Sequence, residues 1–194
     1  MKIALIGSGG HAREVMMQMG KELPCFLSSE FYKGDKNTLL LENFDPEKWE
    51  VMIAIGDPIQ RKKILDILPV ETRFFTFIHE TCMIGKDVEI GQGSFLGAYS
   101  ILTTNIKIGN HSILNRSCHI GHDSFCGDVL SMMPGSILSG NVNIGDRFYI
   151  GTNSAVREKT SICDDVKVGL CSSVIKDITE SGTYVGCPVK KIEL

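Results

Sequence analysis

Apolar residues recur at every sixth position through the second half of the chain. From Ile84 to Val174, all sixteen positions in this phase are apolar, and a glycine often follows them. A period of six differs from the 3.6 residues of a helical turn, but it is a multiple of the two-residue repeat of a strand. A short strand and a turn in every six residues, with three strands to a coil, explain this period. The pattern therefore predicts a left-handed parallel β-helix of about five coils.

Residues eighteen apart should then lie above one another, at roughly the inter-strand spacing of 4.8 Å. This rule places Gly140 over His122, and Gly169 over Gly151. His122 stands beside Asp123, close to a corner and away from the aliphatic interior. A surface histidine next to a carboxylate, with a backbone N–H nearby, can act as a general base beside an oxyanion donor. The glycine columns predict a flat face along which a long, thin ligand could lie.

The first eighty residues carry a different pattern. Buried strands are predicted at 2–6, 24–27, 50–55 and 72–78, helices at 13–21 and 58–68, and a polar, irregular segment at 31–48. The order β-α-β-β-α-β predicts a small Rossmann-like domain, an α/β unit with an open parallel sheet. We expect this domain to span residues 1–80. The β-helix domain then spans residues 81–194 and ends in a capping tail.

The turn after the first strand reads Gly7-Ser8-Gly9-Gly10-His11-Ala12 and fits G-x-G-x-x-A. In this position the motif can offer backbone N–H groups and a helix N-terminus to a phosphate. A tight turn that serves packing alone explains the same residues. Ligands of parallel sheets bind at the carboxyl ends of the strands, where Gly56 also stands.

Composition narrows the classes of function. The net charge of −3 gives no bias toward nucleic acid or an anionic membrane surface. The seven cysteines are scattered without a C-x-x-C pair, which predicts a reduced protein without a zinc site. No apolar run approaches membrane-spanning length, and the N-terminus lacks the pattern of a signal peptide. We expect a cytoplasmic protein that does not insert into a membrane.

The other histidines leave alternatives open. His111 is expected to be an ordinary surface residue. His119 either supports the fold or lines the site, and His11 either caps its own turn or contacts substrate. Because residues 111, 119 and 122 do not repeat on one face of the coil, no metal site is expected.

Several segments together resemble a known family. The chain resembles the sugar acetyltransferases that join a nucleotide-binding domain to a hexapeptide β-helix. It is most similar to the bacillosamine-type UDP-4-amino-sugar N-acetyltransferases, and sialic acid O-acetyltransferases are more distant members. The resemblance covers the whole chain. It rests on Ile6–His11, Ile53–Gly56, Arg61–Ile64, Ile78-His79, Ile113–Asn115, His122-Asp123, Gly140–Val142, Gly151–Ser154 and Val185–Lys190.

The resemblance implies a homotrimer with active sites between neighbouring β-helices and with acetyl-CoA lying along the coils. It implies that His122 is the general base, that Asp123 orients it, and that the Gly140 N–H holds the oxyanion. The other implied residues form two groups. Gly9, Gly10, His11, Gly56, Asn115 and Ser131 would contact the nucleotide sugar, and Gly140, Gly151, Gly169, Gly186 and Pro188 would contact acetyl-CoA.

This chain departs from the family at three places. Asp123 stands where the family has Glu, and Ser131 stands where members often carry a second His. Ser28-Ser29-Glu30 replaces a frequent pair of Asp residues after the second strand. The last difference bears on the nucleotide base, so UDP is expected first while dTDP and GDP stay open.

The expected function is acetyl-CoA-dependent N-acetylation of a nucleotide-linked 4-amino-4,6-dideoxy sugar. The first alternative is O-acetylation of a free, sialic-acid-like sugar. A non-catalytic scaffold and a metal-dependent hydratase are the alternatives from other classes.

Overall fold

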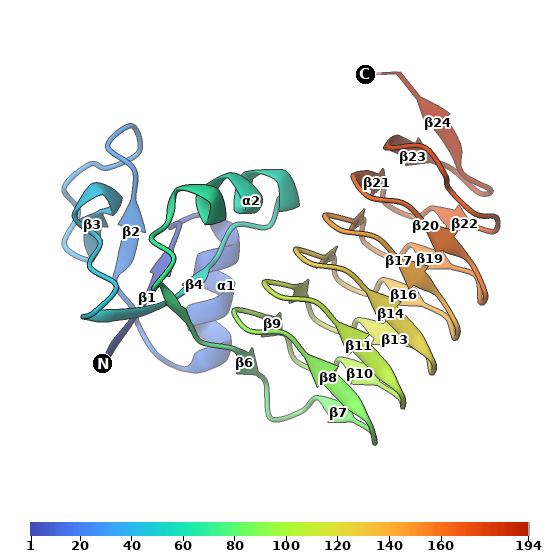
Figure 1. Cartoon of the computed structure of the whole chain (residues 1–194), viewed down its shortest axis with the longest axis horizontal. Helices are drawn as coiled ribbons and strands as arrows, with labels where there is room; N and C mark the ends of the chain where they lie inside the picture. Colours follow the sequence, from blue (N-terminus) through green and yellow to red (C-terminus); the bar gives the residue numbers. More distant parts are fainter. Residues whose placement is uncertain (194) are drawn as a thin grey trace.

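The computed structural model of the protein describes residues 1–193 (Figure 1). The N-terminal part is a five-stranded sheet in the order β3-β2-β1-β4-β5, and all of its neighbouring strands are parallel. Its elements are β1 (Lys2–Ile6), α1 (Gly10–Met19), β2 (Cys25–Leu27), β3 (Thr38–Leu40), a 3-10 turn (Leu41–Asn43), β4 (Trp49–Ile53), α2 (Pro58–Ile67) and β5 (Arg73–Phe74).

Three details differ from the sequence prediction. Helix α1 begins at Gly10 instead of residue 13, so part of the glycine-rich turn is helical. Strand β3 lies in the segment predicted to be irregular, where Leu39 pairs with Phe26 of β2. The strand predicted at 72–78 is divided, because only Arg73 and Phe74 join the N-terminal sheet. Its second part, β6 (Phe77–Ile78), already pairs with the β-helix.

The remaining strands form a parallel β-helix of the left-handed type, as predicted. One sheet contains β7 (Met83–Ile84), β10 (Ile101–Leu102), β13 (His119–Ile120), β16 (Ile137–Leu138), β19 (Ala155–Val156) and β22 (Ser173–Val174). A second contains β8 (Val88–Ile90), β11 (Ile106–Ile108), β14 (Ser124–Cys126), β17 (Asn143–Ile144) and β20 (Ser161–Ile162). The third contains β6, β9 (Phe95–Leu96), β12 (Ile113–Leu114), β15 (Ser131–Met132), β18 (Tyr149–Ile150), β21 (Val166–Val168), β23 (Gly182–Val185) and β24 (Lys190–Ile192).

The eighteen-residue register holds from coil to coil. Leu102 pairs with Ile120, and Ile120 with Leu138. The aliphatic side chains of the six-residue repeat fill the interior, and most are fully buried. At the corners, residues six apart adopt a left-handed backbone, as at Asn105 (φ 53°) and Asp123 (φ 58°). Asn, Asp and Gly tolerate this conformation best, which explains why polar residues gather at the corners.

The glycines that follow the apolar positions make room for the next coil. A Cβ on Gly151 would lie 2.6 Å from the backbone of Gly169, and one on Gly169 would lie 2.8 Å from Val185 Cγ1. The stacking of residues 151 and 169 is therefore confirmed. Coil stacking alone requires glycine here, because the missing side chains would point at the neighbouring coil. The use of this column by a ligand stays a prediction.

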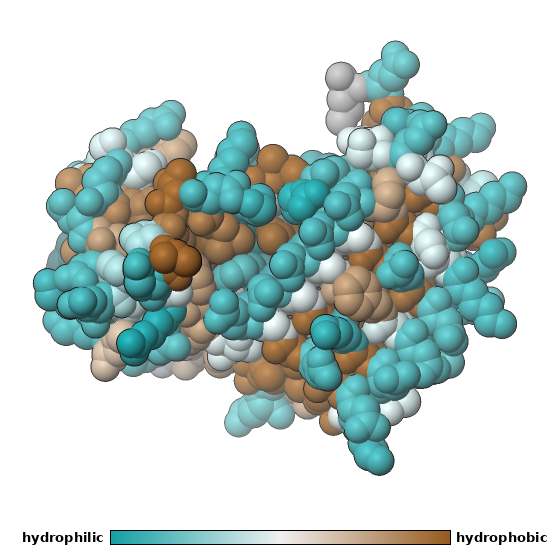
Figure 2. Space-filling model, in the orientation of Figure 1, coloured by the Kyte–Doolittle hydropathy of each residue, from teal (hydrophilic) through white to brown (hydrophobic). Residues whose placement is uncertain are grey.

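The C-terminal tail covers the last coil. Strand β23 pairs in parallel with β21, and β24 turns back antiparallel to β23. At the opposite end Ile78, Met83 and Ile84 stay partly exposed, and hydrophobic surface is visible over these first coils in Figure 2. Within residues 1–193, neither helix is long and apolar enough to cross a membrane.

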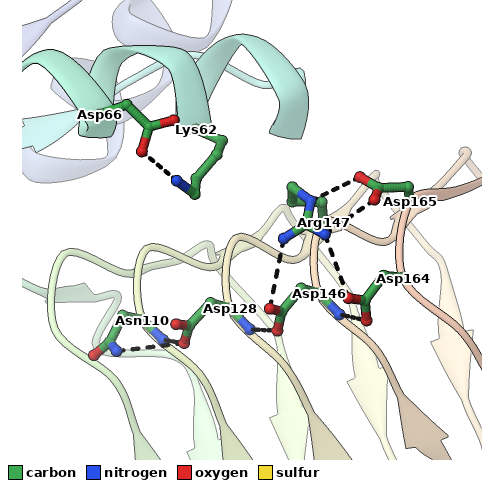
Figure 3. Close-up of polar contacts among 8 residues, drawn as sticks. All are labelled: Lys62, Asp66, Asn110, Asp128, Asp146, Arg147, Asp164 and Asp165. Carbon is green, nitrogen blue, oxygen red and sulfur yellow. Dashed lines mark hydrogen bonds and ion pairs between the residues drawn. The ribbon is translucent and has the colours of Figure 1, made fainter.

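One corner of the β-helix carries a ladder of acids beneath α2 (Figure 3). Carboxylates of Asp128, Asp146 and Asp164 each accept a backbone N–H from the coil before, at 2.7–2.9 Å. Arg147 holds the same row through Asp165 at 2.7 Å and Asp164 at 3.3 Å. Because these carboxylates are occupied by N–H groups and a guanidinium, the ladder supports the fold.

Candidate active site

His122 stands at the corner between β13 and β14. Its Nδ1 lies 2.7 Å from Asp123 Oδ2, and the side chains of His122 and Asp123 are 57 % and 46 % exposed. The other Asp123 oxygen, Oδ1, accepts a hydrogen bond from the Asn105 amide at 2.7 Å. These two bonds, the one from Asn105 first, hold the pKa of Asp123 below its usual value. An anionic Asp123 favours the proton on Nδ1 and leaves the Nε2 lone pair open to accept another.

Gly140 lies directly over the imidazole, as the stacking rule predicted. A Cβ at this position would come within 2.7 Å of His122 Nε2, so a side chain here would displace the ring. The neighbouring Asn141 N–H donates to the His122 carbonyl at 2.7 Å and keeps the two coils in register. Within the described chain, the Gly140 N–H has no hydrogen-bond acceptor. A histidine with an open Nε2 and the backbone of Gly140 therefore stand together at an exposed corner, an arrangement that can serve acyl transfer.

A pocket of about 500 Å³ opens at the carboxyl end of β1. It is lined by Gly7, Ser8 and Gly9, by Phe26–Ser28 and Phe31, and by Gln60 and Lys63 of α2. An apolar wall with a glycine-rich turn and one cation suits a base and phosphates. Of the residues expected to bind the nucleotide sugar, Gly9 lines this pocket. Gly10, His11 and Gly56 are not among its lining residues.

His11 points from α1 toward the β-helix. Its ring packs edge-on against Phe95, with ring centroids 5.2 Å apart, and its Nδ1 lies 3.7 Å from Glu14. Burial and the nearby Arg61 cation lower the pKa of His11 to about 4, so the ring is neutral at pH 7. His11 makes no hydrogen bond to its own turn within the described chain and does not line the pocket, and its contact with substrate stays a prediction.

Asn115 and Ser131 also lie where the two domains meet. Asn115 is buried and donates to Glu14 of α1 at 3.3 Å. Ser131 is fully buried, donates to the Gly56 carbonyl at 2.8 Å and accepts from Arg61 at 2.8 Å. Within one chain their polar groups therefore tie the domains together.

Two further histidines, His111 and His119, lie in the β-helix. The expectation of a surface residue at His111 is wrong: it is 8 % exposed and packs against Phe74, with ring centroids 4.4 Å apart. Burial lowers the pKa of His111 to about 4. His119 is half-buried on the outer face of its sheet, between Ile101 and Ile137.

The remaining predicted cofactor positions lie on the last coils. The Gly186 N–H donates to Ser172 at 3.1 Å, and the bond between Cys187 and Pro188 is cis. Among residues 1–193, no group of three or more His, Cys, Asp or Glu side chains could hold a metal ion.

The pocket and His122 lie on different sides of the β-helix. The N-terminal domain packs on the sheet of β9, β12 and β15, through Phe95, Ile113, Leu130 and Ser131. His122 joins the other two sheets at the corner opposite that face. The N-terminal domain and the turn between β13 and β14, which carries His122, therefore lie on opposite sides of the β-helix (Figure 1).

Sequence reasoning missed two residues here. Asn105 lies eighteen positions before Asp123, so the stacking rule could have found it. Arg61 was visible only as part of a motif, and nothing in its neighbourhood predicts a buried guanidinium that joins two domains.

A parallel β-helix with an open corner histidine, joined to a small Rossmann-like domain, defines the hexapeptide-repeat transferase class. Residues 2–68 match the family of PglD N-terminal domains. The structure is similar to WeeI from Acinetobacter baumannii AYE, at 25 % identity and a TM-score of 0.86, over 98 % of this chain and 99 % of that one.

Two further structures have the same fold. The perosamine N-acetyltransferase from Caulobacter crescentus, solved with CoA and GDP-perosamine, is 22 % identical with a TM-score of 0.86, over 100 % of this chain and 97 % of that one. The acetyltransferase domain of PglB from Neisseria gonorrhoeae FA1090, solved with acetyl coenzyme A, is 23 % identical with a TM-score of 0.67, over 98 % of each chain.

Curated relatives match over shorter stretches. The bifunctional protein GlmU from Clostridium beijerinckii is 30 % identical over 135 residues, which are 70 % of this chain and 29 % of the relative. The chain thus spans about a third of the length of the curated relatives it matches (29 % and 35 %). The predicted resemblance is confirmed: residues 2–68 match the PglD N-terminal domain family, and the whole chain is similar to hexapeptide-repeat proteins that carry such a domain.

Proposed function

We propose that this protein transfers the acetyl group of acetyl-CoA to the amino group of a nucleotide-linked 4-amino-4,6-dideoxy sugar. The observation that carries the proposal is the His122 imidazole, backed by Asp123 at 2.7 Å and placed under Gly140. The related structures solved with CoA, acetyl-CoA and GDP-perosamine support the same pair of substrates. The seven cysteines are all free, which fits work in the reducing cytoplasm.

The proposed reaction proceeds in one transfer without an acyl-enzyme. The amine nitrogen attacks the thioester carbonyl carbon and forms the new C–N bond. His122 Nε2 takes the proton that the nitrogen loses, while the Gly140 N–H stabilises the negative charge on the carbonyl oxygen. Collapse of this intermediate breaks the C–S bond and releases CoA as a thiolate, which the imidazolium can protonate. Loss of a single oxyanion donor costs about 3–4 kcal/mol in related chemistry.

The proposed nucleotide site is the pocket at the end of β1. Its apolar wall suits a base, and Lys63 can pair with the diphosphate. UDP is the nucleotide we expect, from the resemblance of the Gly7–His11 turn to UDP-amino-sugar acetyltransferases. A free sugar acid would leave this pocket empty, which favours the N-acetyltransferase over the sialic-acid O-acetyltransferase.

The proposed assembly is a homotrimer with shared active sites. Because the pocket and His122 of one chain are turned away from each other, a sugar held in one chain would reach the histidine of another. Acetyl-CoA would lie between neighbouring β-helices, along the coils that carry Gly140, Gly151 and Gly169 and toward Gly186 and Pro188. The exposed apolar residues Met83 and Ile137 on the β7 sheet offer a surface for such a contact.

An acceptor panel tests this function. The full chain is incubated with acetyl-CoA and UDP-, dTDP- or GDP-linked 4-amino-4,6-dideoxy sugars, with free sialic acid as the competing acceptor. CoA release and the acetylated product are followed together. We expect N-acetylation of a nucleotide-linked amino sugar. Acetylation of sialic acid alone would favour the O-acetyltransferase, and no transfer to any acceptor would refute the proposal.

Mixing two inactive variants tests the shared site. His122→Ala removes the base, and Gly9→Trp blocks the pocket. If the site is shared, random co-assembly restores about a quarter of the wild-type sites, because each needs one intact pocket and one intact histidine from different chains. If each chain works alone, the mixture stays inactive.

A further inference from the structure

Asn105 is the only partner of the outer Asp123 oxygen within the described chain. Its Nδ2 donates to Asp123 Oδ1 at 2.7 Å, while Asp123 Oδ2 accepts from His122 Nδ1 at the same distance of 2.7 Å. The three side chains form a relay from one coil to the next. Each bond uses a different carboxylate oxygen of Asp123, so both oxygens are held in place and the carboxylate cannot rotate freely.

Asp123 needs this second bond because it is short and exposed. Its side chain is 46 % exposed, and within the described chain His122 and Asn105 are its only side-chain partners. An exposed carboxylate with one partner can rotate about χ1 and χ2 and lose the imidazole. The Asn105 amide removes that freedom from the side that faces away from His122.

The neutral amide also separates two carboxylates. Asp87, Asn105 and Asp123 lie one above another at the same corner, each eighteen residues from the next. The three line one hollow of about 450 Å³, together with Glu89 and Lys107. Lys107 pairs with Glu89 at 3.5 Å, so no cation of this hollow neutralises Asp123. An acid at position 105 would place like charges in contact.

We infer that Asn105 is a positioning residue for the general base, acting through Asp123. This inference rests on the proposed function for its rate effects, but the geometry of the relay stands apart from it. Asn105 donates to Asp123 and orients it. Asp123 then holds the proton on His122 Nδ1 and aims Nε2 at the substrate beneath Gly140.

Two variants that tolerate the left-handed backbone at position 105 (φ 53°) test the inference. Asn105→Gly deletes the amide without backbone strain, and Asn105→Asp replaces the donor with a second carboxylate. We expect kcat to fall roughly tenfold in both, with the KM of both substrates unchanged, because only the aim of the base is lost. In Asn105→Asp the acid limb of the pH–rate profile should also move to higher pH, since a second carboxylate favours the protonated ring.

Asn110→Asp is the matched control. Asn110 makes the same bond one corner away, from its Nδ2 to Asp128 Oδ1 at 3.3 Å, and the substitution changes the charge equally. This variant should keep kcat within about twofold of wild type and should leave the acid limb in place. A general effect of charge or of corner stability would change all three variants alike and would overturn the inference.

A second measurement separates this inference from the proposed function. The chain has five histidines, so ring ¹⁵N signals can be assigned, with His122→Gln marking the one of interest. At a pH where the ring is neutral, wild type should show the Nδ1–H tautomer, and Asn105→Gly should show a mixture. Identical tautomers in both would refute the role of Asn105. A wild-type protein with the expected tautomer and no acetyl transfer would refute the function instead.

Discussion

Arg61 joins the two domains, and its replacement should show how much this junction contributes to stability. The side chain is 1 % exposed and lies between α2 and the β-helix. It donates to the carbonyls of Ile55 at 2.5 Å, His111 at 2.9 Å and Val129 at 3.0 Å. In the described part of the chain, these three carbonyls have no other donor. Burial lowers the pKa of Arg61 to about 9, which leaves the guanidinium charged at pH 7.

The perturbation is Arg61→Met, which keeps much of the volume and removes every donor. Three buried carbonyls without partners cost roughly 3–9 kcal/mol. The variant also removes the cost of burying a cation, which offsets several kcal/mol of this loss. We expect a net loss of about 3 kcal/mol in the free energy of unfolding and a fall in Tm of about 6–12 °C.

Urea unfolding followed by two probes is the assay. Trp49 is the only tryptophan and lies in β4 of the N-terminal sheet, so its fluorescence reports on that domain. Far-UV circular dichroism reports on both domains, because α1 and α2 lie in the N-terminal domain and most strands lie in the β-helix. In Arg61→Met the unfolding transition seen by Trp49 fluorescence should move to a lower urea concentration and separate from the transition seen by circular dichroism. Arg73→Met is the control, because Arg73 is exposed on β5 of the same sheet. A loss below about 1 kcal/mol with coincident transitions would refute the reasoning.

The pKa of His11 is about 4 in the folded protein and 6.5 in the unfolded chain. Between these pH values the unfolded chain binds a proton that the folded protein does not, so the free energy of unfolding decreases as the pH falls from 6.5 toward 4. This loss reaches roughly 3 kcal/mol for His11. In His11→Leu the free energy of unfolding should therefore fall less steeply with decreasing pH than in wild type. An equal dependence on pH would contradict the burial argument. Gly140→Ala would place Cβ 2.7 Å from His122 Nε2, so kcat should fall at least about tenfold with an unchanged Tm, and a normal kcat would show that the ring moves freely. Lys63→Ala should raise the KM of the acceptor about tenfold without changing the KM of acetyl-CoA. Lys62→Ala is the control, because it loses only the ion pair with Asp66, and it should change neither KM. Equal effects of the two variants would place the nucleotide outside this pocket.

The β-helix and the stack at His122 could be predicted because the chain repeats every six residues. Once the register is fixed, Ile120 must pair with Leu138, and Gly140 must then follow over His122. The N-terminal sheet was predicted less completely, since β3 is short and has no periodicity that marks it.

The contacts between the domains could not be predicted from the repeat. His111 and Ser131 occupy ordinary positions of the coil, and only the docking of α2 buries them against Arg61. Likewise, the sequence does not reveal that α1 turns His11 toward Phe95 and away from the pocket. Pairing within a coil is local information, whereas docking depends on how two finished surfaces fit.

The central claim is that His122 is the general base of an acetyl transfer. The most direct test is the kcat of His122→Ala for transfer from acetyl-CoA to a UDP-linked 4-amino-4,6-dideoxy sugar, with assembly and Tm matched to wild type. Loss of a positioned general base should lower kcat by about 10²–10⁴-fold. A fall of less than about tenfold would contradict the assignment.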